Sequence, residues 1–377
     1  MKVLLVYPWS HHCRMMNKLS DILNENGIDT DVLCLANYEF ITKKVTIISA
    51  AILLIEKFIS KFRPVRFRSR LRKRYERYLL PLLFKQYDKI DFHAFMDHYL
   101  NMMSGCIANG IKFDLCLWGS DVLRATPEDF SRREFGYINC NRIKSIELLQ
   151  KKVSSVYDER FNAKFSTVYF GNSNYPVIDS LEDVKCEAIA KQMGIFVPEK
   201  ITVVCGYNGM VTQQHKLMLD EIDMLSNEYK DKIHIVIPMT YGQDEMYKLE
   251  IDSIVRKMNV SYKILDYFLS PEQLAVLRHM STITLNTQTT DAFCGALQES
   301  LYCENIVMIA DWLEYPPYDK NDVFYIKTKV EDIHTNLSKV LSDFSTYRKL
   351  TEGNHKKLRS ISSWEGVSEA WIKAYEL

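Results

Sequence analysis

The chain of 377 residues is longer than one hydrophobic core usually supports, so we expect two domains. With 47% hydrophobic and 25% charged residues, both halves have enough apolar sequence for an ordinary core. The nine cysteines are scattered and include no C-x-x-C pair, which argues against a disulfide framework or zinc site and favours a reducing cytosol. Met1 leads directly into the strand pattern K-V-L-L-V-Y, so we expect no signal peptide.

The formal net charge of zero hides opposite charges on the two halves. Residues 1–195 carry 29 Lys and Arg against 22 Asp and Glu, whereas residues 196–377 carry 19 against 26. A basic half beside an acidic half suggests a different partner for each, with an anionic surface on the basic side.

The first half alternates strand and helix patterns. We expect a strand at Val3–Tyr7, a helix near Met15–Asn26 ended by Gly27, and a strand at Thr30–Leu35. The later patterns predict a helix over about Phe92–Asn109 and strands at Leu115–Trp118, Val153–Val156 and Thr167–Phe170. This β-α-β rhythm is typical of a parallel sheet.

Residues 46–84 combine apolar and basic character. The ten residues Thr46–Ile55 are almost wholly apolar but too few to cross a bilayer, which needs about 20. Lys57–Arg77 then carries ten basic residues and one Glu, interleaved with aromatic and aliphatic residues. We expect this segment to lie on an anionic membrane surface. A solvated basic helix and a nucleic-acid site are the alternatives; no nucleic-acid-binding module accompanies the segment, so we expect no nucleic-acid partner.

The second half repeats the rhythm more regularly. We expect a linker at Gly194–Lys200, strands at Ile201–Cys205, His234–Ile237, Tyr262–Leu265, Ser281–Asn286 and Asn305–Ala310, and helices near Gln214–Asn227, Glu245–Met258 and Pro271–His279. This order predicts a doubly wound domain. Helices near Lys339–Leu350 and Ser363–Tyr375 have no strand after them, and we expect them to fold back across the linker. The predicted domains are residues 1–195 and 196–377.

The segment Thr287–Leu301 (T-Q-T-T-D-A-F-C-G-A-L-Q-E-S-L) joins the last two of these strands. Asp291, Gly295 and Glu299 are four residues apart and share one face if the segment is helical. Thr289, Thr290 or Asp291 would cap that helix, whose free amides attract phosphate, while Glu299 would accept hydrogen bonds from ribose. The pattern predicts a nucleotide-sugar site, although an ordinary surface helix also carries acids at this spacing.

Three further segments resemble one bacterial family. V-V-C-G-Y-N-G-M-V-T-Q-Q-H-K (Val203–Lys216), V-I-P-M-T-Y-G (Val236–Gly242) and L-S-P-E-Q-L-A-V-L-R (Leu269–Arg278) resemble the transferases that move 4-acetamido-4,6-dideoxygalactose from its dTDP carrier to a lipid-linked sugar, and W-G-S-D (Trp118–Asp121) is also similar. The resemblance implies a GT-B fold, in which two Rossmann-like doubly wound domains face each other across a cleft. A dehydrogenase would need G-x-G-x-x-G after a strand, and the chain has none.

Thr287–Leu301 also resembles the acid-x7-acid motif of many GT-B enzymes, with Asp291 and Glu299 as the acids. It departs from that motif in having Asp as the first acid and Ala292 in place of the expected glycine. The Arg and Lys that often neutralise the diphosphate in that group have no clear counterpart after Gly206. The phosphate contacts and the stereochemical outcome therefore do not follow from the motif.

The resemblance places the nucleotide-sugar donor at the carboxyl ends of the C-terminal strands, where loops and helix N-termini converge. Gly206 and Gly209 would let the backbone approach a diphosphate, Asn208 would donate from its side chain, and a protonated His215 would hold phosphate. The remaining predicted donor-site residues are Thr240, Tyr241, Asp266, Thr289, Thr290, Asp291, Gly295 and Glu299. Turn formation, a solvent-facing histidine and a turn-capping Asp266 are the structural alternatives.

The N-terminal domain would supply the acceptor side. His11 and His12 follow the first strand, and either is a competent general base near neutral pH if the reaction inverts configuration. Asp121 is the third catalytic candidate, as a base or as an orienter of a sugar hydroxyl. These residues are equally compatible with a histidine turn and a helix cap. We expect no metal and no cofactor.

We therefore expect a glycosyltransferase on the cytoplasmic face of the inner membrane. It would transfer a sugar from a nucleotide diphosphate to a lipid-linked glycan acceptor in bacterial surface polysaccharide synthesis. A membrane-recruited nucleotide-sugar-binding protein of the same fold, without catalysis, is the alternative, and an oxidoreductase is a weaker one.

Overall fold

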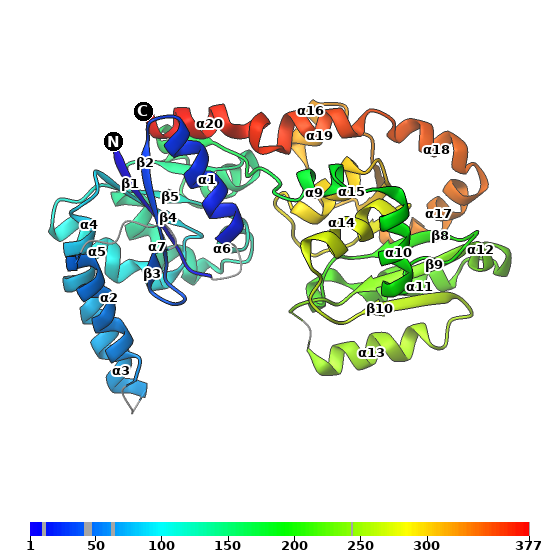
Figure 1. Cartoon of the computed structure of the whole chain (residues 1–377), viewed down its shortest axis with the longest axis horizontal. Coiled ribbons are helices and arrows are strands. Elements are labelled where there is room, and N and C mark those ends of the chain that lie inside the picture. The colour runs from blue at the N-terminus through cyan, green and yellow to red at the C-terminus, as the bar shows by residue number, and fades with distance from the viewer. Residues whose placement is uncertain (10–12, 41–46, 62–64, 243, 377) are drawn as a thin grey trace. The chain divides into compact units, whose positions relative to one another are not determined.

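The computed structural model describes residues 1–377 except 10–12, 41–46, 62–64, 243 and 377. The chain forms two compact units, each built from helices around one sheet (Figure 1). Unit 1 comprises Met1–Ser173 and Trp364–Leu377, and unit 2 comprises Asn174–Ser363.

The described part of unit 1 contains a seven-stranded sheet in the order β3-β2-β1-β4-β5-β6-β7. All neighbouring strands are parallel except β2 and β3, which are antiparallel. The strands are β1 (Lys2–Tyr7), β2 (Asp29–Cys34), β3 (Glu39–Phe40), β4 (Lys89–His93), β5 (Phe113–Cys116), β6 (Ile143–Ser145) and β7 (Phe165–Thr167).

The helices of unit 1 are α1 (Cys13–Glu25), α2 (Ile47–Ile59), α3 (Val65–Arg74), the π-helical turn η1 (Tyr75–Leu79), α4 (Leu80–Phe84), η2 (Asp97–Tyr99), α5 (Leu100–Ala108), α6 (Ser120–Leu123), α7 (Pro127–Asn139), α8 (Glu147–Val156), η3 (Asn162–Lys164) and the C-terminal α20 (Trp364–Glu376). The predicted strand at Val153–Val156 is wrong, because these residues are the last turn of α8. Leu149 and Val153 are buried four residues apart, a helical spacing that outweighs the short β-branched run. The predicted helix over Phe92–Asn109 begins later, at Leu100, after the end of β4.

The core of unit 1 is completed by the C-terminus of the chain. Trp364, Val367 and Trp371 of α20 are buried in the same apolar cluster as Val3 and Leu5 of β1. Of the C-terminal helices predicted to fold back, α20 thus belongs to unit 1, whereas α17 (Ile333–Ser342), α18 (Phe344–Thr351) and α19 (Asn354–Ser362) belong to unit 2.

The described part of unit 2 contains a six-stranded, wholly parallel sheet in the order β10-β9-β8-β11-β12-β13. Its strands are β8 (Ile201–Cys205), β9 (Ile233–Pro238), β10 (Ser261–Leu265), β11 (Ile283–Asn286), β12 (Ile306–Ala310) and β13 (Ile326–Thr328). The other helices are α9 (Tyr175–Asp179), α10 (Asp183–Met193), η4 (Val211–Gln213), α11 (His215–Asp223), α12 (Asn227–Lys232), α13 (Glu245–Val255), α14 (Pro271–Met280), α15 (Gly295–Tyr302), α16 (Pro316–Lys320) and η5 (Val330–Asp332). Both units are therefore Rossmann-like, as the strand and helix patterns predict.

The boundary between the units lies at Ser173, 22 residues before the predicted boundary at residue 195. The reason is the packing of α9 and α10. Cys186, Ala190 and Met193 of α10 are buried against Val204 of β8 and Leu277 of α14. The segment that follows β7 is therefore part of the second core rather than the end of the first.

Candidate functional site

The strand order of unit 2 reverses between β8 and β11. The chain leaves β8 toward β9 on one side, and it returns through β11 to β12 on the other. The loops that follow these two strands diverge at this point, which is where open α/β sheets form a ligand crevice. Residues 206–214 follow β8, and residues 287–294 follow β11. Six of the twelve predicted donor-site residues lie in these two loops, and His215, Gly295 and Glu299 lie in the helices that follow them.

Gly206, the first residue after β8, has no room for a side chain. Its φ is +70°, and its amide donates to the carbonyl of Leu285 on β11 at 3.0 Å. A Cβ at this position would lie 2.9 Å from both Gln213 Oε1 and His215 Nε2. One side chain from η4 and one from the first residue of α11 thus converge on the glycine, and both the conformation and the space require glycine.

Gln213 and His215 each have a buried side-chain nitrogen without a hydrogen-bond partner. Both residues are fully buried. Gln213 Oε1 accepts the amide of Tyr207 at 3.0 Å, which directs Nε2 of the same side chain elsewhere. Gln213 Nε2 and His215 Nε2 are buried without a hydrogen-bond partner, and so is Thr212 Oγ1. A buried polar atom without a partner costs free energy, so three within four residues indicate a site built for a ligand.

The hydroxyl of Tyr247 sets the tautomer of His215. It lies 3.1 Å from the His215 amide, whose hydrogen it accepts, and 3.0 Å from Nδ1. All three groups are satisfied when Tyr247 donates to Nδ1, which leaves the ring hydrogen on Nε2. Burial lowers the pKa of His215 to about 4. The imidazole is therefore neutral at physiological pH, and it offers one N–H donor at Nε2 rather than the positive charge that the sequence suggested.

Helix α11 begins beside these atoms; the amide of its first residue, His215, donates to the Tyr247 hydroxyl, while its N-cap residue supplies no side-chain acceptor. Its N-cap residue, Gln214, has φ +57°, and neither a side-chain cap nor an acidic residue occupies the first turn. The positive end of the helix dipole is therefore not neutralised locally. Together with the buried nitrogens of Gln213 and His215, it forms a neutral group of hydrogen-bond donors, a chemistry suited to an anion such as phosphate.

Asn208, Gly209 and Tyr241 are brought together, but their donors are already used. Asn208 Oδ1 accepts the amide of Met210 at 2.9 Å, and its Nδ2 donates to the Tyr241 hydroxyl at 3.3 Å. The Gly209 amide donates to the Tyr241 carbonyl at 2.8 Å. The amides of Gly206 and Gly209 are therefore both hydrogen-bonded within the protein, and the close approach of this backbone to a diphosphate stays a prediction. Tyr241 is half exposed, and the preceding Thr240 is partly buried.

The predicted cap of the second loop is wrong. Helix α15 begins at Gly295 with Cys294 as its N-cap, so Thr289, Thr290 and Asp291 precede the helix. Asp291 is buried and accepts the Tyr315 hydroxyl at 2.7 Å. Burial raises its pKa, whereas hydrogen bonds from Cys294, Tyr315 and the Ala292 amide lower it. Asp291 thus already supplies an acceptor at this helix end, so α11 is the better phosphate site.

Glu299 lies in the second turn of α15 and forms an ion pair that sequence reasoning missed. Its Oε2 accepts Arg278 Nε from α14 at 3.1 Å, and both side chains are buried. The two charges also affect the Tyr241 hydroxyl. Burial raises the pKa of that tyrosine; the charge of Arg278 lowers this pKa, and the charge of Glu299 raises it. A Glu299 carboxylate that binds ribose would therefore do so while it is paired with buried Arg278.

Asp266, the remaining predicted donor-site residue, follows edge strand β10. Its Oδ2 accepts Lys248 Nζ from α13 at 2.6 Å. That hydrogen bond lowers the pKa of Asp266, which is exposed. The residue lies two strands away from β8 in the sheet order, so the structure does not bring it to the crevice.

Of the catalytic candidates, His11 and His12 lie outside the described residues. Asp121 is buried at the start of α6. Its carboxylate accepts the amides of Phe95 and Gly119 at 2.8 Å each, and that of Trp118 at 3.0 Å. Burial raises its pKa, and these backbone hydrogen bonds lower it. Asp121 therefore holds the loops after β4 and β5 together.

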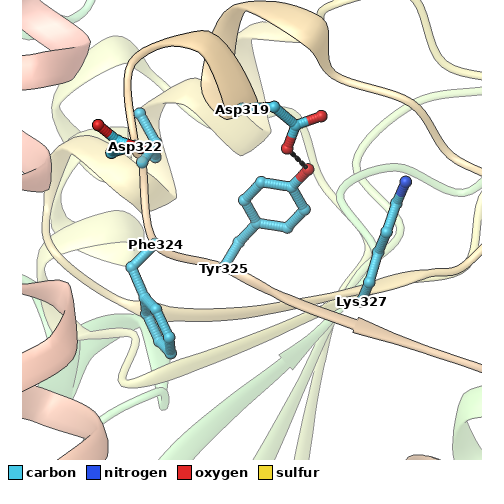
Figure 2. Close-up of a pocket in the computed structure, with 6 residues that line it drawn as sticks. Asp319, Asp322, Phe324, Tyr325 and Lys327 are labelled. Carbon is cyan, nitrogen blue, oxygen red and sulfur yellow. Dashed lines mark hydrogen bonds between the residues drawn. The ribbon is translucent and has the colours of Figure 1, made fainter.

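A separate pocket of about 460 Å³ lies before β13 in unit 2. Figure 2 shows the Tyr325 hydroxyl donating to Asp319, with Lys327 extending from the same segment on the same side as Tyr325. The pocket is lined by Asp319, Asp322, Val323, Phe324, Tyr325 and Lys327, none of which is a predicted site residue. Across the described ranges, no three His, Cys, Asp or Glu side chains are grouped so that they could hold a metal ion.

Comparison with known proteins gives a fold but no sequence family. No protein-family model matches the chain, and no curated protein matches it. Among solved structures, the chain is similar over its full length to the Anabaena protein HepE in complex with UDP and glucose, at 9% identity over 99% of that chain and a TM-score of 0.70. It is also similar to a glycosyltransferase from Rickettsia africae, at 10% identity over 97% of that chain and a TM-score of 0.72.

A third similar structure is the UDP-GlcNAc 2-epimerase of Neisseria meningitidis bound to UDP-GlcNAc, at 12% identity over 100% of both chains and a TM-score of 0.64. Identities this low establish the fold and leave the reaction open. The chain therefore has two Rossmann-like α/β units of the GT-B type, as the sequence predicts.

Proposed function

We propose that this protein is a glycosyltransferase that uses a nucleotide diphosphate sugar. The observation that carries the proposal is the group of unpartnered buried atoms of Thr212, Gln213 and His215 at the N-terminus of α11. They lie at the switch point of a parallel sheet, where the fold places ligands. That HepE and the Neisseria epimerase were solved with uridine nucleotides supports this choice of ligand.

In this proposal the diphosphate sits on the first turn of α11. The Nε2 atoms of Gln213 and His215 donate to phosphate oxygens, and the helix dipole favours the charge that develops as the diphosphate leaves. Tyr241 and Asp291 border the same crevice, and the Glu299 carboxylate accepts hydrogen bonds from the ribose hydroxyls. Because the donors are neutral and fixed by Tyr207 and Tyr247, the site is organised before the ligand arrives.

The acceptor in this proposal is a lipid-linked glycan intermediate of bacterial surface polysaccharide. Its support is the resemblance of Val203–Lys216, Val236–Gly242 and Leu269–Arg278 to transferases of 4-acetamido-4,6-dideoxygalactose. In an inverting reaction, His11 or His12 takes the proton of the acceptor hydroxyl. Asp121 keeps the acceptor-side loops in place. The proposal involves no metal, because the neutral donors and the positive end of the helix dipole stabilise the leaving group by hydrogen bonding and electrostatics.

The test has two stages. Purified protein is first screened with UDP- and dTDP-sugars for a rise in melting temperature, which ligand binding to the folded state produces by mass action. The stabilising donor is then incubated with lipid-linked acceptor, and nucleoside diphosphate release is followed with and without acceptor. Acceptor-dependent release supports the proposal. Failure of every nucleotide sugar to raise the melting temperature contradicts it.

A second candidate is a nucleotide-sugar-binding protein without turnover. The observation that favours it is the composition of the crevice loops: neither residues 206–215 nor residues 287–294 include a lysine or arginine. These loops therefore supply no cation to a departing diphosphate. The same experiment separates the two candidates, because this protein would be stabilised by donor yet release no diphosphate with any acceptor.

A further inference from the structure

Helices α2 and α3 and the turn η1, which we call the basic arm, form an antiparallel extension of unit 1. Figure 1 shows α2 and α3 running away from the sheet. Arg72 Nε of α3 donates to Glu56 of α2 at 2.7 Å, and Arg68 of α3 reaches the carbonyl of Ser60 at 3.4 Å, so the two helices lie side by side.

The inner face of the basic arm is fixed to unit 1. Ile52, Leu53 and Ile59 of α2 are buried. Glu76 of η1 is also buried, and its carboxylate accepts the Tyr38 hydroxyl at 2.9 Å and Asn101 Nδ2 at 3.3 Å. These contacts account for both carboxylates within the arm, Glu56 and Glu76, so its acidic groups are used internally.

The outer face leaves large apolar side chains in water. Phe58 is 70% exposed and Leu54 62% exposed, on neighbouring turns of α2. On α3, Val65 is 65% and Phe67 49% exposed. Exposed apolar residues are common singly, but grouped on one short arm they mark an interaction surface.

Cations surround these side chains. Lys61, Arg66, Arg70, Lys73 and Arg74 are all exposed, and in the described part of the chain no carboxylate lies within ion-pair distance of them. Their charge is therefore available to an anionic partner. Apolar side chains flanked by free arginines match the boundary between acyl chains and anionic headgroups.

We propose that the basic arm docks on an anionic phospholipid surface, with Leu54 and Phe58 entering the headgroup boundary and the basic residues bound to lipid phosphate. Helix α2 has 13 residues, about 20 Å of helix against the about 30 Å of a bilayer core. None of the described helices is long and apolar enough to cross a membrane. The arm therefore lies in the interface.

A nucleic acid would use the arginines and stack bases on Phe58, but it would leave the aliphatic Leu54 and Val65 in water, and a second copy of the arm would bring like charges together. The lipid surface alone uses both features. Anionic lipid is characteristic of the cytoplasmic leaflet, so docking would hold the protein on that face of the inner membrane. This inference rests on the arm and stands whether or not the chain transfers sugar.

Flotation with phosphatidylcholine vesicles, with and without phosphatidylglycerol, tests the docking. One variant replaces Lys61, Arg66, Arg70, Lys73 and Arg74 by glutamine; Arg72 is kept because it pairs with buried Glu56. Its control replaces the exposed Lys151, Lys152, Lys257, Lys329 and Lys349, which changes the net charge equally. We expect the wild type and the control to float only with phosphatidylglycerol, and the arm variant to bind at least about tenfold more weakly.

A second variant, Leu54→Ser with Phe58→Ser, keeps the charge and removes only exposed apolar groups. We expect this variant also to bind vesicles at least about tenfold more weakly than wild type. If binding were purely electrostatic, its affinity would be unchanged. The proposal is overturned if the wild type does not float, if the arm variant floats like its control, or if the serine variant binds like wild type. Stronger binding to duplex RNA, or dimerisation through the arm, would assign the surface to those partners instead.

Discussion

The chemistry of the candidate site depends on His215 being a neutral donor. At the level of the sequence, a histidine after G-Y-N-G-M-V-T-Q-Q suggested a cationic phosphate ligand. Burial without a neighbouring carboxylate reverses that expectation, because desolvation disfavours the charged ring. The sequence gives no signal for this, since the burial arises from Tyr247 on α13 and from the packing of Gly206 against the ring.

The depressed pKa of His215 predicts a pH dependence of stability. Its pKa is about 4 in the folded protein and about 6.5 in the unfolded chain, so only the unfolded chain binds this proton between those values. The stabilisation is complete above about pH 6.5 and is lost as pH falls toward 4, by about 3 kcal/mol in all. In denaturant unfolding of unit 2, His215→Gln should flatten the stability profile in this window. The exposed His279→Gln is the control; an equal slope in both variants would contradict the burial argument.

Glu299 presents a second prediction at the scale of one residue. If its carboxylate receives ribose hydroxyls, Glu299→Gln should weaken nucleotide binding about 10- to 100-fold. The variant also takes the counter-charge from buried Arg278, so its melting temperature should fall. Calorimetry with nucleoside diphosphates that have or lack the ribose 3′-hydroxyl separates the two effects. Wild type should discriminate between them and the variant should not; undiminished discrimination would remove Glu299 from the ribose site.

At the scale of elements, the two helix N-termini of the crevice differ in a way that spacing does not reveal. The four-residue spacing of Asp291, Gly295 and Glu299 predicted one continuous helix. The chain instead places Asp291 before α15, where Tyr315 from the loop after β12 holds it. The N-cap residue of α11 supplies no side-chain acceptor. Long-range contacts therefore decide which helix end remains open for a ligand.

The strands of unit 1 carry a buried charge cluster that predicts a large stability effect. Lys144 of β6 is fully buried, 3.2 Å from Asp91 of β4 and 2.6 Å from Asp114 of β5. Burial lowers the pKa of Lys144, but the two carboxylates raise it by more than burial lowers it, so the lysine stays charged. Lys144→Met should cost about 3–5 kcal/mol of unfolding free energy, because two buried carboxylates lose their counter-charge.

Denaturant unfolding of the Lys144→Met variant, compared with Lys151→Met on the exposed side of α8, measures this effect. A loss no larger than that of the surface control would show that Lys89, which lies 3.4 Å from Asp114, is enough to compensate the cluster. Such a cluster could not be predicted from sequence, because it depends on the register of three parallel strands that are distant in the chain.

At the scale of the whole molecule, the alternation of strand and helix patterns predicted the architecture, whereas tertiary packing determines the domain boundaries. Every strand predicted in the second half is present, because buried parallel strands read as short apolar runs. The edge strand β13 was missed, since Ile326–Thr328 is short and contains a lysine. The domain boundary was placed too late, because α9 and α10 join the second core through tertiary contacts with the strands and helices of unit 2.

The most direct test is calorimetric titration with the nucleotide sugar that raises the melting temperature. It asks whether the side-chain nitrogens at the N-terminus of α11 bind the diphosphate. The variants are Gln213→Leu and His215→Phe, each removing one unpartnered donor, and the control is His234→Gln near the amino end of β9, whose ring already contacts Ser261 and Gly194. We predict that each site variant binds the nucleotide sugar at least about tenfold more weakly than wild type, and that the control binds it with wild-type affinity. Equal affinity in all four proteins would place the diphosphate elsewhere.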